Sequence, residues 1–465
     1  MYGSKVCGVW EVFVLVYNRR MKYQSSAKND RGEQGVSDLT ASNAQAGHAR
    51  ATEYAATMRA AMSDSSYKLP EASLRLPFDS VLYEKSRVLA AKLAGPKLNY
   101  VVTIGIGGSN LGTKAVYEAI FGTLDAHSPF APKMLFADTC SPEILSDITE
   151  ILVNEIISPE ELIIVVASKS GTTTETIVNA SVLITALEQK LGSLSSRIVC
   201  ITDEGSVLWQ TGEKQGFHLL PIPKMVGGRY SVFSPVGIFP LLCVGLEVDR
   251  MLKGAQEAVH DSVERGVESN AYRAAEDVLA WNENGALVFD MFLFQPEFES
   301  LGKWYRQLFA ESLGKETAKN GTSTTHRMIP TVSIGSTDLH SAEQMHLAFP
   351  SLVARTLVRV NAPHWEHEFL ASDRVFAPLV PGLAGRAPCH IMDAIYEGVK
   401  EAYRTRGVQF AEIELPDLTL ESLGALLQFE MCMVMHLANL LNINAFDQPN
   451  VETYKEATRR ILGGK

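Results

Sequence analysis

NYVVTIGIGGSNLG, residues 99–112, begins as a short apolar run, ends in glycines and leads into a helical stretch from Leu111. The same order of apolar run, polar loop and helix returns in ELIIVVASKSGTTTET, residues 161–176, and a third apolar run at residues 197–202 ends at Asp203. Short, continuous apolar strands that alternate with helices are typical of a parallel sheet with helices on both faces. These residues therefore predict an α/β fold.

The same pattern occupies the second half of the chain. Apolar runs at residues 286–291 and 331–334 indicate strands of a second sheet, with helices at residues 237–276, 304–313 and 420–441. The sequence thus predicts two αβ units in tandem, each a parallel sheet between helices, with a helical C-terminal tail. The predicted limits are an N-terminal extension at 1–50, a first domain at 51–270, a second domain at 271–440 and a tail at 441–465 that carries Lys455.

Composition and charge narrow the classes of protein. The 465 residues, 46% hydrophobic and 20% charged, have the proportions of an ordinary globular protein with room for two or three domains. A formal charge of −11 argues against a nucleic-acid partner, because phosphate backbones are bound by clustered Lys and Arg. Six scattered cysteines argue against a zinc site and a secreted disulfide framework, and favour a reducing compartment.

The N-terminus raises the one question of a membrane. Residues 6–17 are largely apolar, but Glu11 interrupts them and the run is too short to cross a bilayer. No small-residue cleavage site follows, so no targeting signal is expected. We therefore interpret residues 1–20 as an extension ahead of Met21, and we expect a cytoplasmic protein without a membrane partner.

Two loops after predicted strands have the composition of anion-binding segments. GIGGSNLG, residues 105–112, lies between a strand and a helix, where free N–H groups can face an anion. The same glycines also fit a tight turn or half of a dinucleotide site, with Asp138 as its acidic residue, and they do not decide between these. SKSGTTTET, residues 168–176, places six hydroxyls and a lysine after a strand. That number exceeds what helix capping needs, and it favours a phosphate monoester.

Several further side chains are candidates for chemistry. Gln307 and Glu311 share one helix face, and Gly314 should end that helix and leave the carboxylate near its terminus. His340 follows the predicted strand 331–334, at the edge of the sheet where ligands bind in open α/β folds. Taken alone, such a Gln/Glu pair is an ordinary polar stripe on a helix, and a lone histidine is more often structural. Arg229 and Lys455, the other two candidates, would by themselves be interpreted as surface cations.

A metal site is not expected. His364, Glu366 and His367 superficially suggest a zinc motif, but their order is not HExxH and the set lacks further ligands.

Together, these segments resemble the glucose-6-phosphate isomerase (phosphoglucose isomerase) family in its shorter bacterial-type branch. Six motifs occur in the family's order between residues 99 and 455: GIGGSNLG, SKSGTTTET, GGRYSVFSPVG, RQLFAESLGKE, GSTDLHS and FDQPNVETYK. The resemblance implies two sugar-isomerase (SIS) domains and a homodimer with its active site at the subunit interface. It also implies reversible isomerisation of glucose 6-phosphate to fructose 6-phosphate in glycolysis and gluconeogenesis, through a cis-enediol(ate) and without a metal or cofactor.

The resemblance assigns roles to single residues. Glu311 matches the base that moves a proton between C2 and C1, and Arg229 matches the group that stabilises the charged intermediate. His340, from the partner subunit, and Lys455 match the pair that opens the sugar ring, and Glu175 matches a residue that orients the histidine. Gln307 and Gln448 would line the sugar site. The phosphate would be bound by Gly108, Ser109, Ser168, Lys169, Ser170, Thr172 and Thr173.

Three rival functions remain open at this point. Another aldose–ketose isomerase, including a dual phosphoglucose/phosphomannose enzyme, would share the phosphate loop and a glutamate base. A catalytically silent sugar-phosphate sensor would keep the loop but need not retain Glu311, His340 and Lys455 together. A nicotinamide dehydrogenase would give the loop at residues 168–176 no role.

Overall fold

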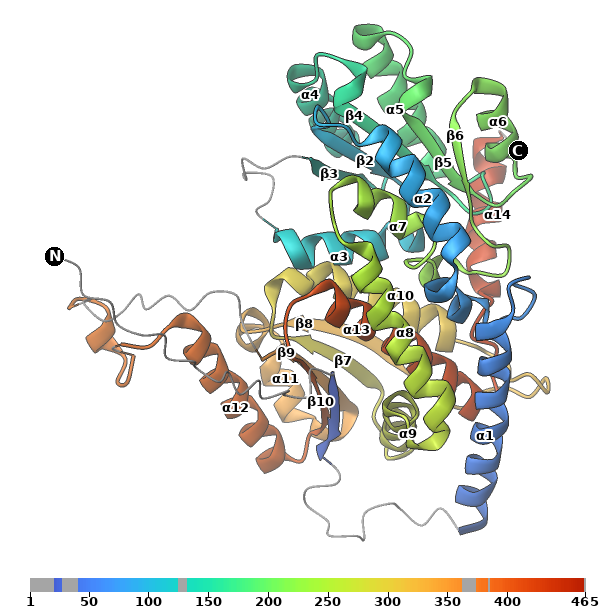
Figure 1. Cartoon of the computed structure of the whole chain (residues 1–465). Coiled ribbons are helices and arrows are strands. Elements are labelled where there is room, and N and C mark those ends of the chain that lie inside the picture. Colours follow the sequence, from blue (N-terminus) through green and yellow to red (C-terminus); the bar gives the residue numbers. More distant parts are fainter. Residues whose placement is uncertain (1–20, 27–40, 124–131, 362–373, 384, 464–465) are drawn as a thin grey trace, which may run out of the picture.

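The chain folds around two separate five-stranded sheets with helices on their faces (Figure 1). The computed structural model describes residues 21–26, 41–123, 132–361, 374–383 and 385–463, with the main chain alone for residues 41–48. The predicted α/β class, with parallel sheets between helices and a helical C-terminal end, is confirmed. The domain limits drawn from the sequence remain a prediction.

The first sheet is parallel throughout, in the order β3-β2-β4-β5-β6. Successive side chains of its central strands point into two different apolar layers, because side chains alternate across a strand. Burial on both faces explains the continuous apolar runs in the sequence. Its strands are β2 (Tyr100–Ile104), β3 (Lys133–Ala137), β4 (Leu162–Ala167), β5 (Ile198–Thr202) and β6 (His218–Pro221). The helices of this part of the chain are α2 (Ser80–Leu93), α3 (Leu111–Phe121), α4 (Pro142–Glu155), α5 (Thr174–Leu191), α6 (Val207–Gln215) and α7 (Pro235–Cys243).

The second sheet has the order β1-β10-β9-β7-β8, and it is parallel except for β1, which runs antiparallel to β10. β1 lies inside the predicted N-terminal extension, so part of that segment belongs to a sheet. The strands of the second sheet are β1 (Lys22–Ser25), β7 (Val288–Leu293), β8 (Ile329–Ile334), β9 (Val353–Val360) and β10 (Gln409–Leu415). The remaining helices are α1 (Ala41–Ser63), α8 (Val248–Arg265), α9 (Asn270–Glu283), α10 (Glu299–Leu313), α11 (Glu343–Ala348), α12 (Pro388–Arg406), α13 (Leu420–Leu440) and α14 (Glu452–Leu462).

One continuous apolar core joins the two sheets. α10 packs against α3, and α13 packs against α8 and α9, so helices from the two halves of the chain share this core (Figure 1). Within the described residues, α13 is the one helix long and apolar enough to span a membrane by length and composition, and 83% of its 18-residue apolar stretch is buried inside the protein. Its apolar length is therefore explained by its central position in the fold.

α13 also buries two titratable side chains. Glu430 is 2% exposed, and its Oε2 has no hydrogen-bond partner among the described residues. Burial raises the pKa of Glu430 to about 8. His436 is 1% exposed, its Nε2 lies 2.7 Å from the hydroxyl of Ser262, and burial lowers its pKa to about 4. At neutral pH both side chains are therefore uncharged in the folded protein.

Glu430 should make the protein less stable as the pH rises from 6.5 to 8. In this range the folded chain keeps the Glu430 proton, while the unfolded chain, with an ordinary pKa of 4.5, has released it. Folding then takes up a proton, which lowers the free energy of unfolding by about 1 kcal/mol per pH unit. The opposite effect of His436 fades as the pH rises past its ordinary pKa of 6.5, and wild type and Glu430→Gln share it. Urea unfolding at both pH values should show a smaller decline for Glu430→Gln.

A control variant is available on the same helix. Glu421 lies in the first turn of α13 and forms an ion pair with Lys253 at 2.6 Å, with 31% of its side chain exposed. Glu421→Gln should keep the wild-type dependence on pH. Equal declines for wild type and Glu430→Gln would contradict a protonated Glu430 in the core.

Candidate active site

Two glycine-containing turns touch each other at the centre of the candidate site. The turn that follows β2 meets the turn at residues 227–231 so closely that a Cβ on Gly108 would lie 2.0 Å from the carbonyl carbon of Gly228. The hydroxyl of Ser231 donates to the carbonyl of Gly108 at 3.2 Å. Only glycine permits this approach of two main chains. The contact places the GIGGS loop directly beside Arg229.

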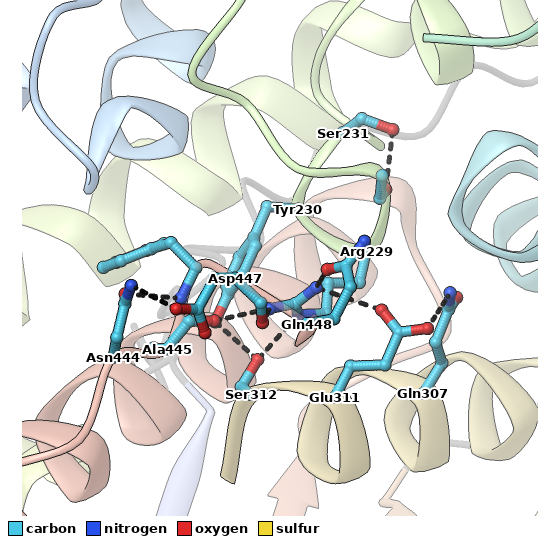
Figure 2. Close-up of polar contacts among 12 residues, drawn as sticks. Arg229, Tyr230, Ser231, Gln307, Glu311, Ser312, Asn444, Ala445, Asp447 and Gln448 are labelled. Atoms are coloured by element: carbon cyan, nitrogen blue, oxygen red, sulfur yellow. Dashed lines mark hydrogen bonds and ion pairs between the residues drawn. The ribbon is translucent and has the colours of Figure 1, made fainter. Parts of the chain in front are cut away.

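Arg229 is the organising group of the site, and it is 1% exposed. Its Nη1 donates to the carboxylate of Glu311 at 3.0 Å and to Oε1 of Gln448 at 2.5 Å, and its Nε donates to the hydroxyl of Ser312 at 2.8 Å (Figure 2). Its Nη2 donates to two main-chain carbonyls, those of Ala445 at 2.6 Å and Asp447 at 3.2 Å. A guanidinium has five N–H donors, and these contacts use all five.

Glu311 lies in the last turn of α10, which ends at Leu313 with Gly314 as its C-cap, as the glycine predicted. Its Oε2 accepts from Arg229, and its Oε1 accepts from the amide of Gln307 at 3.0 Å. The carboxylate is therefore held from two sides, yet 27% of its side chain is exposed. The other amide atom, Oε1 of Gln307, is buried and has no partner among the described residues. It is available to a hydroxyl donor beside the carboxylate.

The hydroxyl-rich loop lies at the same edge of the first sheet, because β2 and β4 are parallel neighbours. Ser168 is fully buried and its hydroxyl lies 2.8 Å from that of Thr173, while the hydroxyl of Ser170 accepts from the main-chain N–H and the hydroxyl of Thr172, both at 3.3 Å. α5 begins directly after Thr173 and directs its N-terminal N–H groups to the loop. The arrangement suits an anion.

Lys169 supplies the positive charge of this loop. Burial lowers the pKa of Lys169, Asp203 opposes that effect, and the positive charge of Arg229 adds to it. The influence of Arg229 means that the lysine lies within electrostatic reach of the group that holds Glu311. The positive charges of Lys169 and Arg229 therefore act on each other.

His340 and Lys455 do not join this cluster within the described chain. His340 is exposed in the 3-10 turn Thr337–His340 that follows β8, and it is not among the partners of Glu311 described above. Lys455 lies on α14, 36% exposed, and pairs with Glu452 at 2.8 Å. Glu175 lies in the first turn of α5. Ser109 closes the turn Gly107–Ser109 beside Gly108.

Four residues to which the sequence assigned no role hold the site together: Tyr230, Ser312, Lys315 and Asp447. Ser312 binds Arg229 and also lies 2.8 Å from the hydroxyl of Tyr230. Lys315 donates to the main-chain carbonyl of Glu311 at 2.8 Å and pairs with a carboxylate oxygen of Asp447 at 3.0 Å. These residues lie inside the motifs GGRYS, ESLGK and FDQ, close to the candidate residues. This position in the sequence is the feature from which their role could have been predicted.

The described residues offer no candidate metal centre. Across these ranges, no group of three or more His, Cys, Asp or Glu side chains is arranged to hold a metal ion. His364, Glu366 and His367, for which a metal site was not expected, lie outside those ranges. Two hollows of about 660 and 720 Å³, one beside α2 and β6 and one between α4 and α5, contain none of the predicted site residues.

The fold and the site define an α/β protein with two largely parallel sheets and a carboxylate fixed between an arginine and an amide. The family model for phosphoglucose isomerase matches residues 86–355. The chain is 31% identical over 407 residues to a glucose-6-phosphate isomerase of Acholeplasma laidlawii, covering 84% of this chain and 90% of the relative. A glucose-6-phosphate isomerase of Mycoplasmopsis synoviae is 32% identical over 390 residues, with 82% and 87% covered. This chain belongs to the phosphoglucose isomerase family.

Solved structures agree on the fold. A hypothetical protein from Thermus thermophilus has a TM-score of 0.78 at 28% identity, covering 90% of this chain and 97% of that one. A glucose-6-phosphate isomerase from Chlamydia trachomatis has a TM-score of 0.77 at 21% identity, covering 95% and 88%.

Proposed function

We propose that this chain is a glucose-6-phosphate isomerase that interconverts glucose 6-phosphate and fructose 6-phosphate. Family membership and the names of the relatives support the reaction. The single observation that carries the proposal is the carboxylate of Glu311, which is held by Arg229 and Gln307 and remains partly exposed. A fixed carboxylate next to a fixed positive charge is what removal of a proton beside a carbonyl requires.

Glu311 is the base of this reaction. The sugar ring first opens, with a proton delivered to the ring oxygen by His340 or Lys455, since imidazolium and ammonium groups both donate N–H. Glu311 then removes the proton from C2, which leaves a cis-enediol(ate), and returns it to C1, while the hydroxyl proton of O2 passes to O1, to give the ketose. One carboxylate can reach both carbons because they are neighbours. No step of this sequence needs a metal or a cofactor.

Arg229 stabilises the negative oxygen of the enediolate. Because all five of its N–H donors are engaged, a substrate oxygen gains a donor only by displacing one of the acceptors. Gln448 is the acceptor that leaves most easily, since it is a neutral side chain on an exposed residue. Once displaced from Arg229, Gln448 would bind a hydroxyl of the sugar instead.

The phosphate is bound by Gly108 and Ser109 of the first loop and by Ser168, Lys169, Ser170, Thr172 and Thr173 of the second. Hydroxyls, a lysine and the start of α5 favour a dianionic monoester there. Binding energy gained at the phosphate holds the reacting carbons in place at a distance from it.

The active enzyme is a homodimer in the cytoplasm, acting in glycolysis and gluconeogenesis. The exposed His340, outside the hydrogen-bond network of Glu311, supports its contribution to the site of a second subunit, where Glu175 would orient it. Sedimentation velocity tests this assembly, and a monomer at working concentration would contradict it.

A coupled assay of the purified protein tests the reaction itself. We expect fructose 6-phosphate to form from glucose 6-phosphate at the same rate with and without a chelator. The same assay with mannose 6-phosphate distinguishes this reaction from that of a dual-specificity isomerase. Absence of glucose 6-phosphate turnover would overturn the proposal.

Ser170→Arg should raise the KM for glucose 6-phosphate at least tenfold. Ser170 is exposed and its hydroxyl orients Thr172 across the loop, so a long charged side chain would displace the phosphate from the start of α5 without disturbing the core. Steady-state kinetics with glucose 6-phosphate measure the effect.

Ser193→Arg is the matched control, because the exposed Ser193 follows the opposite end of α5, roughly 27 Å from the loop by helical rise. Its kinetics should equal those of wild type. An unchanged KM and kcat in Ser170→Arg would argue against a phosphate site in this loop.

A further inference from the structure

Lys315 forms a buried link between the helix that carries the base and the loop that carries Gln448. It is the second residue past the end of α10, and its side chain is 6% exposed. Its ammonium donates to the main-chain carbonyl of Glu311 at 2.8 Å and to the main-chain carbonyl of Asp447, and it lies 3.0 Å from a carboxylate oxygen of Asp447. An ammonium has three N–H donors, so this set of acceptors satisfies it.

The contact with Glu311 completes the end of α10. The N–H of Gly314 binds the carbonyl of Ala310 at 2.9 Å, and the N–H of Lys315 binds that of Leu313 at 2.8 Å. The carbonyl of Glu311 is thus one of the last-turn carbonyls that a helix leaves for other donors, and the lysine side chain supplies one. A cation at this end also opposes the negative end of the helix dipole. The main chain of the base itself is fixed in this way.

The contact with Asp447 fixes the opposite side of the site. The carbonyl of Asp447 accepts from both Lys315 and Arg229, and the second carboxylate oxygen of Asp447 accepts from Asn444 at 2.8 Å. Asp447 immediately precedes Gln448, whose amide oxygen binds Arg229. Two cations therefore hold one carbonyl, and through it they determine where Gln448 meets the guanidinium.

We propose that Lys315 is a positioning residue, which sets Glu311 and the Asp447–Gln448 segment relative to each other for the isomerisation. The proposal rests on the function proposed above, since it concerns the rate of that reaction. Lys315 makes no contact with the phosphate loop among its described contacts, so it acts on the chemical step. Its loss should shift the carboxylate and Gln448 while phosphate binding continues.

Lys315→Met should lower kcat about 10- to 100-fold and change KM less than about threefold, because a misplacement of about 1 Å at the reacting groups costs that much rate. Lys315→Arg should recover part of the loss, since it keeps the charge but not the geometry of the ammonium. Lys303→Met is the matched control: Lys303 lies on α10 in a surface ion pair with Glu299 at 2.9 Å. It should behave as wild type.

Asp447→Asn provides a second variant that should fold, because its carboxylate is 53% exposed. We expect a smaller loss of kcat, about three- to tenfold, with KM unchanged, since both main-chain carbonyls still bind the lysine. In a Gln448→Ala background, Lys315→Met should cost less kcat than it does alone, because part of its effect passes through Gln448.

The outcomes separate this proposal from the proposed function. An unchanged kcat in Lys315→Met or in Asp447→Asn would overturn the positioning role, as would a loss confined to KM. Equal losses with and without Gln448 would likewise contradict the link to that residue. If wild type and Lys303→Met fail to convert glucose 6-phosphate, the proposed function fails instead.

Discussion

Glu311→Gln should lower kcat for glucose 6-phosphate isomerisation by about 10³- to 10⁴-fold, the contribution of a general base. An amide of the same shape cannot accept the C2 proton. It also presents an NH₂ group toward Arg229 or Gln307, both of which donate to the present carboxylate. Binding of glucose 6-phosphate, measured by calorimetry, should remain within about threefold of wild type because the phosphate loop is untouched.

Two further variants test whether the loss of rate depends on the position of this carboxylate. Glu311→Asp keeps the charge but withdraws it by one methylene, so it should recover only part of the rate. Glu299→Gln changes a glutamate in the first turn of the same helix, where 54% of the side chain is exposed, and it should leave kcat unchanged. Turnover of Glu311→Gln within tenfold of wild type would show that another group is the base.

Arg229→Ala should remove both activity and stability. Loss of a fixed donor to the developing oxyanion costs about 10²- to 10³-fold in kcat. The substitution also removes one donor each from the carboxylate of Glu311, the hydroxyl of Ser312 and two main-chain carbonyls. Because the guanidinium is buried and donates five hydrogen bonds, its loss should lower the free energy of unfolding by about 3–5 kcal/mol. Kinetics and chemical unfolding measure the two effects separately.

Arg229→Lys distinguishes charge from geometry. It keeps a positive charge but has three donors instead of five, so it should be more stable than Arg229→Ala and still far below wild type in kcat. Arg250→Ala removes an arginine that is 46% exposed in a surface pair with Glu247, and it should change stability by less than about 0.5 kcal/mol. Wild-type stability in Arg229→Ala would contradict its central place in the network.

Four of the five predicted strands, β2, β4, β5 and β7, are largely buried on both faces, and the fifth, β8, is mostly half-buried. β2, β4 and β5 are continuous apolar runs, whereas β9 carries Arg355, whose charge interrupts the apolar pattern. Arg355 is 1% exposed and donates to Asp290 of β7 through Nε at 3.0 Å and Nη2 at 2.5 Å. β10 likewise contains charged residues that pair with neighbouring elements, and β1 is a four-residue edge strand. Such strands depend on tertiary partners that local pattern does not reveal.

The candidate residues could be found from the sequence, but their mutual arrangement could not. Glycines 107 and 108 indicated a close approach to a ligand, and Gly108 in fact meets the main chain beside Arg229. Arg229, Glu311 and Gln448 are far apart in the chain, and spacing alone gave no reason to join them. Their hydrogen bonds form because the C-terminal end of α10 and the segment that follows α13 both lie against Arg229 (Figure 2).

Transfer of the C2 proton by Glu311 is tested most directly by the reaction in D₂O. Glucose 6-phosphate is incubated with the purified protein, and deuterium at C1 of the fructose 6-phosphate is followed by NMR. A carboxylate that holds the proton between two steps exchanges part of it with solvent, so we expect deuterium at C1 with wild type and none with Glu311→Gln. Deuterium at C1 of the product made by Glu311→Gln, at a rate close to that of wild type, would contradict proton transfer by this base.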